Sequence, residues 1–150
     1  MMIEAVCDGP RAAKPSDARA CAEIVNGWID GRDWMPRVHS REDVIEFYEK
    51  FVFKRREVWV SGNPVSGFVA LDVFNNMVTA LYVSNPGMGI GKALLDHAKT
   101  GRDMLELWTF VANEDARRFY AREGFREIRV TEGDNEEGLP DMLWRWERSA

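Results

Sequence analysis

The chain has 150 residues, of which 45% are hydrophobic and 30% are charged. A chain of this length supports one domain that buries about 68–70% of the surface of its unfolded state. The formal net charge of -5 opposes the attraction to phosphate backbones on which non-specific nucleic-acid binding depends. We therefore expect a single globular domain over residues 1–150 that does not bind nucleic acid.

Cysteine and histidine are scarce, with two of each: Cys7, Cys21, His39 and His97. These residues are too few for a disulfide framework or for a zinc site with four protein ligands. No apolar stretch approaches the roughly 20 residues of a membrane-spanning helix, and residues 1–4 lack the pattern of a signal peptide. We expect a reduced, metal-free, cytoplasmic protein that is neither secreted nor embedded in a membrane.

The first third of the chain predicts two amphipathic helices. Apolar residues at a spacing of three to four predict a helix over 17–29. Ser40 with Asp43 three residues later resembles a capping box, and it opens a second helix that ends near 54–56. The connecting loop 31–39 carries aromatic, basic and imidazole groups that no regular period explains.

The rest of the chain alternates short strands with two more helices. Runs of β-branched and aromatic residues bounded by turns predict strands at 57–61, 65–72, 77–83, 104–110, 125–132 and 141–147. Helical periods predict a helix over 90–100 and another between Asn113 and Gly124. The expected fold is mixed α/β (α+β), with a twisted, mainly antiparallel sheet of six to seven strands flanked by about four helices.

A glycine-rich turn connects strand 77–83 to helix 90–100. Gly87, Gly89 and Gly91 allow the backbone to approach a ligand closely, and the N-terminus of a helix attracts anions. The turn therefore suits a phosphate or pyrophosphate. A simple strand-to-helix turn is the alternative, because the spacing fits neither the Walker A loop nor the dinucleotide-binding motif.

A longer pattern surrounds this turn. The strand Leu81-Tyr82-Val83 leads into the turn and its helix, the strand 105–108 follows, and Asn113 then opens a helix that continues through Phe119-Tyr120 to Gly124-Phe125. In order and spacing this pattern resembles the GNAT superfamily of N-acetyltransferases. Pro86 departs from it, since the family has Gln or Arg there, and proline lacks an N–H group for the pyrophosphate.

The resemblance implies acetyl-CoA as the cofactor. The pantetheine arm would lie along Leu81, Tyr82 and Val83, and the pyrophosphate would lie over Gly87, Met88, Gly89, Ile90, Gly91 and Lys92. Asn113 would contact the cofactor arm, although a helix cap alone also explains an asparagine at this position. Tyr120 would stand near the sulfur as the general acid for the departing thiolate, with a core aromatic as the alternative.

The general base and the acceptor site are less well marked. Glu106 on the central strand is the first candidate for the base, followed by Asp72 and His39. The loop and the last two strands would line the acceptor pocket, through Trp34, Met35, Arg37 and His39, with Trp144 or Trp146 opposite. The remaining expectations are core positions for Trp28, Trp59 and Trp108, a packed His97, and a solvated acidic loop at 132–137.

We therefore expect transfer of an acetyl group from acetyl-CoA to a small-molecule or peptide amine, by direct attack and without a covalent enzyme intermediate. A non-catalytic acyl-CoA binding or sensing module is the main alternative. A structural protein whose glycine loop is only a turn is the weaker one. The acceptor cannot be named from the sequence, and a homodimer is left open.

Overall fold

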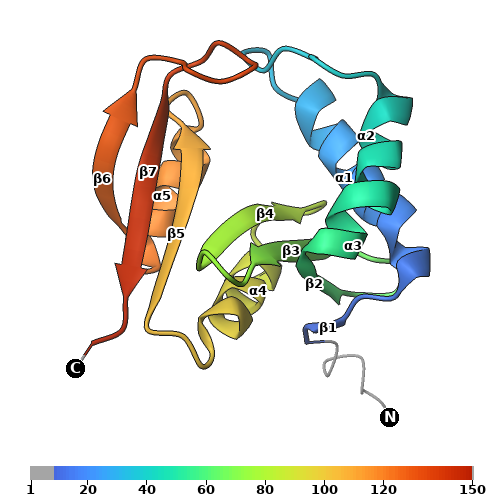
Figure 1. The fold of residues 1–150 in the computed structure, drawn as a ribbon, viewed down its shortest axis with the longest axis horizontal. Coiled ribbons are helices and arrows are strands. Elements are labelled where there is room, and N and C mark those ends of the chain that lie inside the picture. The colour runs from blue at the N-terminus through green and yellow to red at the C-terminus, as the bar shows by residue number, and fades with distance from the viewer. Residues whose placement is uncertain (1–8, 150) are drawn as a thin grey trace.

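A computed structural model describes residues 9–149 of the chain, so that Cys7 lies outside the described residues (Figure 1). Within this part, one seven-stranded sheet has the order β1-β2-β3-β4-β5-β7-β6. The strands are β1 Arg11–Ala12, β2 Glu57–Ser61, β3 Gly67–Asp72, β4 Met77–Val83, β5 Met104–Phe110, β6 Arg126–Thr131 and β7 Asp141–Glu147. The helical elements are η2 Pro15–Asp17, α1 Ala18–Asp30, α2 Arg41–Phe47, η3 Tyr48–Val52, α3 Phe53–Arg55, α4 Ile90–Lys99 and α5 Glu114–Arg122.

The expected mixed α/β fold is confirmed, and β2, β4, β5 and β7 have the predicted bounds. The second predicted helix is a continuous helical run through α2, η3 and α3, with a π-helical turn in its middle. Its cap is also confirmed, since the Ser40 hydroxyl accepts a hydrogen bond from the Asp43 N–H at 3.1 Å. The two-residue strand β1 was not predicted, because so short a run leaves no periodic pattern.

Two hydrophobic clusters lie on opposite faces of the sheet, because neighbouring residues of a strand point to opposite sides. On one face, Phe68 and Ala70 of β3 pack against α1, α2 and η3. On the other face, Val69 and Leu71 pack with residues of α4, α5, β5 and β7. Each helical layer therefore has its own core, and the sheet is buried between them.

The sheet opens between β4 and β5. The register between β3 and β4 shifts from Ala70↔Ala80 to Leu71↔Val78, so Thr79 is an extra residue on β4. Among the described residues, β4 pairs with β5 only through the parallel bridge Met77↔Glu106. Because a bulge bends the strand that carries it, the two strands diverge beyond this point (Figure 1).

Candidate functional site

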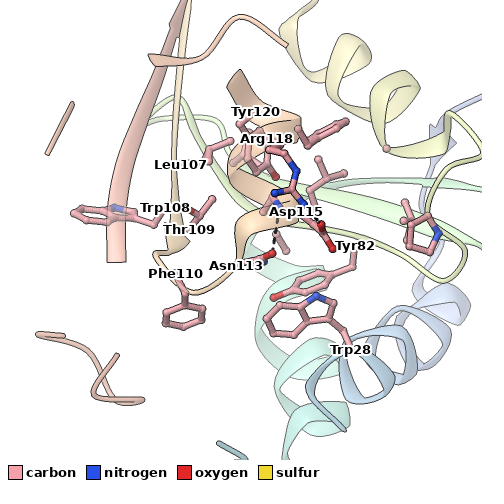
Figure 2. Close-up of a pocket in the computed structure, with 18 of the residues that line it drawn as sticks. Trp28, Tyr82, Leu107, Trp108, Thr109, Phe110, Asn113, Asp115, Arg118 and Tyr120 are labelled. Carbon is pink, nitrogen blue, oxygen red and sulfur yellow. Dashed lines mark hydrogen bonds and ion pairs between the residues drawn. The ribbon is translucent and has the colours of Figure 1, made fainter. Parts of the chain in front are cut away.

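A cavity of about 750 Å³ lies where β4 and β5 separate (Figure 2). Its lining comes from 78–83 of β4, 107–110 of β5, the glycine turn, and one side of α5. Trp28 of α1, Arg32 just after α1, and the loop between β6 and β7 complete it. Segments distant in the sequence thus meet at one opening in the sheet.

The edge of β4 that faces the cavity carries unpaired backbone groups. Ser84 N–H donates to Ser66 O at 2.8 Å on the β3 side. Since backbone groups alternate between the two sides of a strand, Tyr82 also faces β3 while Leu81 and Val83 face the cavity. An extended ligand can therefore pair with Leu81 and Val83 as an added strand would.

The glycine turn provides amide donors at one end of the cavity. Gly87 and Gly89 have φ angles of 88° and 78°, which favour glycine, and Gly89 is the N-cap of α4. The first intrahelical bond runs from Ala93 N–H to Gly89 O, so the amides at 90–92 precede the helical ladder. These amides and the helix dipole favour an anion at this position.

The small size of Gly91 leaves room for a close ligand. A Cβ added there would meet Phe119 and Val83 at 3.7 and 3.8 Å, which is ordinary van der Waals contact. The protein alone therefore has space for a larger side chain at this position. With a ligand lying on the turn, that space would be taken by the ligand.

Two residues of the predicted turn lie outside the cavity lining. The Met88 side chain is 72% exposed, and Ile90 packs against the core beneath the sheet. Lys92 lines the cavity, but its ammonium group lies 3.2 Å from Asp96 and 3.1 Å from Glu123, and these carboxylates raise its pKa. The positive charge of Lys92, which was expected to meet a phosphate, is thus already largely balanced by Asp96 and Glu123.

Asn113 and Tyr120 both line the cavity from α5 (Figure 2). Asn113 Oδ1 accepts the Ala116 N–H at 3.1 Å, so Asn113 caps α5, while its Nδ2 takes no part in the cap. The Tyr120 ring packs edge-on against Phe119 and Phe125 at 5.1 and 5.5 Å, and burial raises the pKa of its hydroxyl well above the ordinary range. Tyr120 is both a core aromatic and a cavity residue.

The structure does not bring the three candidate bases into the cavity lining. Glu106 lies at the closed end of the cleft, where its carboxylate is 2.7 Å from Arg145 Nη2 on β7. Asp72 is hydrogen-bonded to Asn75 at 2.8 Å in the turn after β3. His39 Nε2 lies 2.7 Å from Glu136 Oε1. Each side chain thus already has a partner outside the lining.

The loop before α2 supports the cavity more than it lines it. The Arg37 guanidinium donates hydrogen bonds to Asp30 at 2.9 Å and to Asn26 at 3.0 Å, and these bonds connect the loop to α1. Trp34 packs edge-on against Trp28 at 5.7 Å and Phe110 at 5.8 Å. Since Trp28 and Phe110 are themselves lining residues, Trp34 lies directly behind them.

The expected positions of several tryptophans were wrong. Trp144 is buried, and its indole N–H donates to Thr109 Oγ1 at 2.9 Å, while Trp146 packs beneath Lys99. Neither faces the acceptor side. Trp28 and Trp108, which were expected in the core, line the cavity. Trp108 is 39% exposed, and Arg129 Cζ lies 5.1 Å from its ring centre, so its indole is not part of the core.

The loop between β6 and β7 supplies residues that the sequence did not reveal. Its acidic run was expected to be solvated, yet Glu137 lines the cavity. The lining contains four carboxylates: Asp115, Glu123, Glu137 and Asp141. Asp115 pairs with Arg118, Glu123 with Lys92, and Asp141 accepts from Thr131 and Asn135. Among the described residues, only Glu137 of these four has no ion-pair or hydrogen-bond partner.

No helix within residues 9–149 has the length and apolar character needed to cross a membrane. The same residues contain no group of three or more His, Cys, Asp or Glu side chains arranged to hold a metal ion.

The open sheet, the glycine turn and the lined cleft define an α/β protein built to hold an extended, anionic ligand. Residues 54–127 match the family model described as the acetyltransferase (GNAT) domain. The matched segment is a GNAT acetyltransferase domain, as its motifs indicated.

A curated relative supports this assignment. The chain is 37% identical to an uncharacterized N-acetyltransferase of Methanocaldococcus jannaschii over an alignment of 116 residues, which covers 63% of this chain. The match spans 51% of that relative, so the chain covers about half the length of the curated protein it resembles.

Solved structures show the same fold. The apo form of YjaB from Escherichia coli has a TM-score of 0.74 and 21% identity, with 91% of this chain and 95% of that chain covered. The structure of yncA from Salmonella typhimurium, solved with its cofactor acetyl-CoA, has a TM-score of 0.66 and 22% identity, with 92% of each chain covered.

Proposed function

We propose that this protein transfers an acetyl group from acetyl-CoA to a primary amine. The observation that carries the proposal is the cleft between β4 and β5, where an unpaired strand edge leads to a helix N-terminus opened by glycines. The match to the GNAT domain and the acetyl-CoA bound to a protein of the same fold support it.

The residues present fit two parts of acetyl-CoA, its pantetheine arm and its pyrophosphate. Its pantetheine arm carries amides that can pair with the backbone of Leu81 and Val83. Its pyrophosphate is an anion of the kind that the amides at 90–92 favour, and the missing Cβ of Gly91 leaves the space. Arg122 also lines this end, and among the described residues its guanidinium takes part in no ion pair.

When bound, acetyl-CoA supplies an activated acetyl thioester. The protein has to bring an uncharged amine to it, and an ammonium group has a pKa near 10.4 for a lysine-like amine, so it must first lose a proton. Glu137 is the lining carboxylate without a partner among the described residues, and we propose that it receives this ammonium group. Glu106 stays an alternative base, although it would have to act while paired with Arg145.

We propose that Tyr120 assists the departing sulfur. Its hydroxyl stays protonated at neutral pH because burial raises its pKa. A thiolate has a pKa near 8.5, so complete proton transfer from so weak an acid is unfavourable. The hydroxyl therefore stabilises the developing thiolate mainly by donating a hydrogen bond, and the sulfur takes its proton from solvent or from the attacking nitrogen.

Two measurements test the proposal. Acetyl-CoA at a hundredfold excess over its dissociation constant should stabilise the fold by about 2.7 kcal/mol in a thermal unfolding experiment. A panel of primary amines should then include acceptors that release the free thiol of CoA. Binding without thiol release from any amine would instead indicate an acyl-CoA binding or sensing module, and no binding would reject both functions.

A further inference from the structure

Two opposite charges lie at the end of the cavity away from the glycine turn. Arg32 lines this end from just beyond the C-terminus of α1, and its Cζ lies 5.0 Å from the Trp28 ring centre. Glu137 lines it from the loop between β6 and β7. In the part of the chain described, neither side chain forms a hydrogen bond or an ion pair, with the other or with a third residue.

Arg32 and Glu137 line the cavity together with Tyr82, and both charges act on its hydroxyl group. The pKa of Tyr82 is raised to about 12, mainly by burial; the negative charge of Glu137 also raises it, and the positive charge of Arg32 lowers it. The two side chains therefore come from different segments and line the same cavity beside Tyr82. A ligand placed beside Tyr82 would meet a cation and an anion together.

Aromatic rings enclose this point. Trp28 packs edge-on against Tyr82 at 5.4 Å (Figure 2), and Trp34 packs against Phe110 at 5.8 Å. Rings exclude water, and charges interact more strongly where water is excluded. Partly buried charges without partners are costly, so the arrangement favours a ligand that satisfies both of them.

We propose that this end of the cavity binds the zwitterion of a free α-amino acid, and this proposal rests on the acetyl-transfer function above. Arg32 takes the carboxylate, because a guanidinium fork matches two carboxylate oxygens. Glu137 takes the ammonium group, which is the nitrogen to be acetylated. An amine without a carboxylate would leave Arg32 unpaired.

A peptide acceptor fits this arrangement less well. In a free amino acid the ammonium and carboxylate groups are attached to the same carbon, so one small ligand reaches both Arg32 and Glu137. In a peptide the terminal ammonium is next to a neutral amide, and the carboxylate is at the far end of the chain. The paired charges therefore select the free amino acid.

Matched acceptors test the proposal. L-Phenylalanine, L-phenylalaninamide and 2-phenylethylamine share a side chain and an amine, and they differ in whether a carboxylate is present. L-Leucine and 3-methylbutylamine form a second pair with a smaller side chain. Release of the CoA thiol gives kcat/KM for each, and we expect the free amino acid of a set to exceed its carboxylate-free partner by about 100-fold.

Variants then assign the charges. Arg32→Gln should bring the ratio between amino acid and matched amine close to one, while the dissociation constant of acetyl-CoA stays within about twofold. Glu137→Gln should lower kcat/KM for all acceptors. Arg126→Gln and Glu132→Gln are the matched controls, because both residues lie outside the cavity lining and Glu132 belongs to the same loop as Glu137.

The outcomes separate this proposal from the proposed function. Turnover of amines with no preference for a carboxylate, in both acceptor sets, would overturn the amino-acid proposal and leave acetyl transfer intact. A loss of acetyl-CoA affinity in Arg32→Gln would also overturn it, because Arg32 would then be a cofactor contact. Failure of acetyl-CoA to bind the parent protein would reject the underlying function itself.

Discussion

His39 Nε2 lies 2.7 Å from Glu136 Oε1, and this pair joins the loop before α2 to the loop between β6 and β7. Figure 1 shows the two loops meeting above the divergence of β4 and β5. Arg32 lies near the start of the first loop and Glu137 directly follows Glu136, and both line the cavity. The pair thus holds together the two sides of the proposed acceptor end.

Loss of this pair should loosen acceptor binding without affecting the cofactor. We expect His39→Ala to raise the acceptor KM several-fold, while the dissociation constant of acetyl-CoA and the Tm change little because exposed pairs stabilise a fold weakly. Steady-state kinetics and calorimetric titration measure the two constants. Glu132→Gln is the control in the same loop. Equal losses of both affinities would show that the pair maintains the whole cavity.

Gly91 should be essential for cofactor binding and dispensable for folding. Gly91→Val should abolish the thermal stabilisation by acetyl-CoA, since its side chain would occupy the space above the turn. Gly91→Ala should weaken it, and Gly27→Ala provides the control because a Cβ at Gly27, in α1, meets nothing within 4 Å. A normal acetyl-CoA shift in Gly91→Val would place the pyrophosphate elsewhere.

The fold was largely predictable because its signals are local. Periodicity, glycine turns and the caps Ser40 and Asn113 determine where elements begin and end, and each depends on neighbours only a few residues apart. The two-residue β1 lacks such a signal. The register shift at Thr79 also escaped prediction, since a bulge depends on the partner strand.

The cofactor end of the site was predictable for the same reason, whereas the acceptor end was not. Leu81, Gly91 and Tyr120 belong to one continuous motif. Arg32 and Glu137 are separated by more than a hundred residues and meet only through the tertiary fold. Glu137 also sits within an acidic run, which has the composition of a solvated loop, so nothing in the sequence distinguishes it from Glu136.

Substitution of Glu106 should separate a structural role from a catalytic one. Glu106→Gln removes the partner of Arg145 in a half-buried pair and should lower the free energy of unfolding by about 1–3 kcal/mol. We expect kcat to stay within about threefold of the parent value, because Glu106 lies outside the cavity lining. Loss of a general base would instead lower kcat by at least about a hundredfold. If kcat of Glu106→Gln falls further than about threefold, while the pH optimum for binding of the substrates is unchanged, Glu106 is the general base after all. Arg145→Gln should reproduce the stability loss.

The three tyrosines should resist alkaline titration together. Burial raises the pKa of Tyr82 to about 12 and raises those of Tyr48 and Tyr120 well above their ordinary value. Below pH 10 the three tyrosine hydroxyls are protonated in both the folded and the unfolded state. Above it the unfolded chain loses protons that the folded chain retains, so stability should fall as the pH rises from 10. Absorbance at about 295 nm should therefore rise only with unfolding; ionisation of a folded chain near pH 10 would contradict this.

Tyr120→Phe should distinguish assistance to the leaving group from simple packing. The ring is retained, and the hydroxyl forms no hydrogen bond with any residue between 9 and 149, so the Tm and acetyl-CoA affinity should remain almost unchanged. The lost hydrogen bond to the sulfur should lower kcat by about 10²-fold, the lower end for general acid catalysis, because a thiolate leaves readily without full protonation.

Tyr48→Phe is the matched control for this substitution. Tyr48 is equally buried, and it packs against Phe68 on the opposite face of the sheet, away from the cavity. Its kcat should match that of the parent protein. If kcat of Tyr120→Phe also stays within about twofold, the hydroxyl contributes nothing to the leaving group, and Tyr120 acts as a core aromatic alone. If kcat falls only for acyl donors with poor leaving groups, the hydroxyl acts where sulfur departs, because a hydrogen bond matters most when the leaving group is most basic.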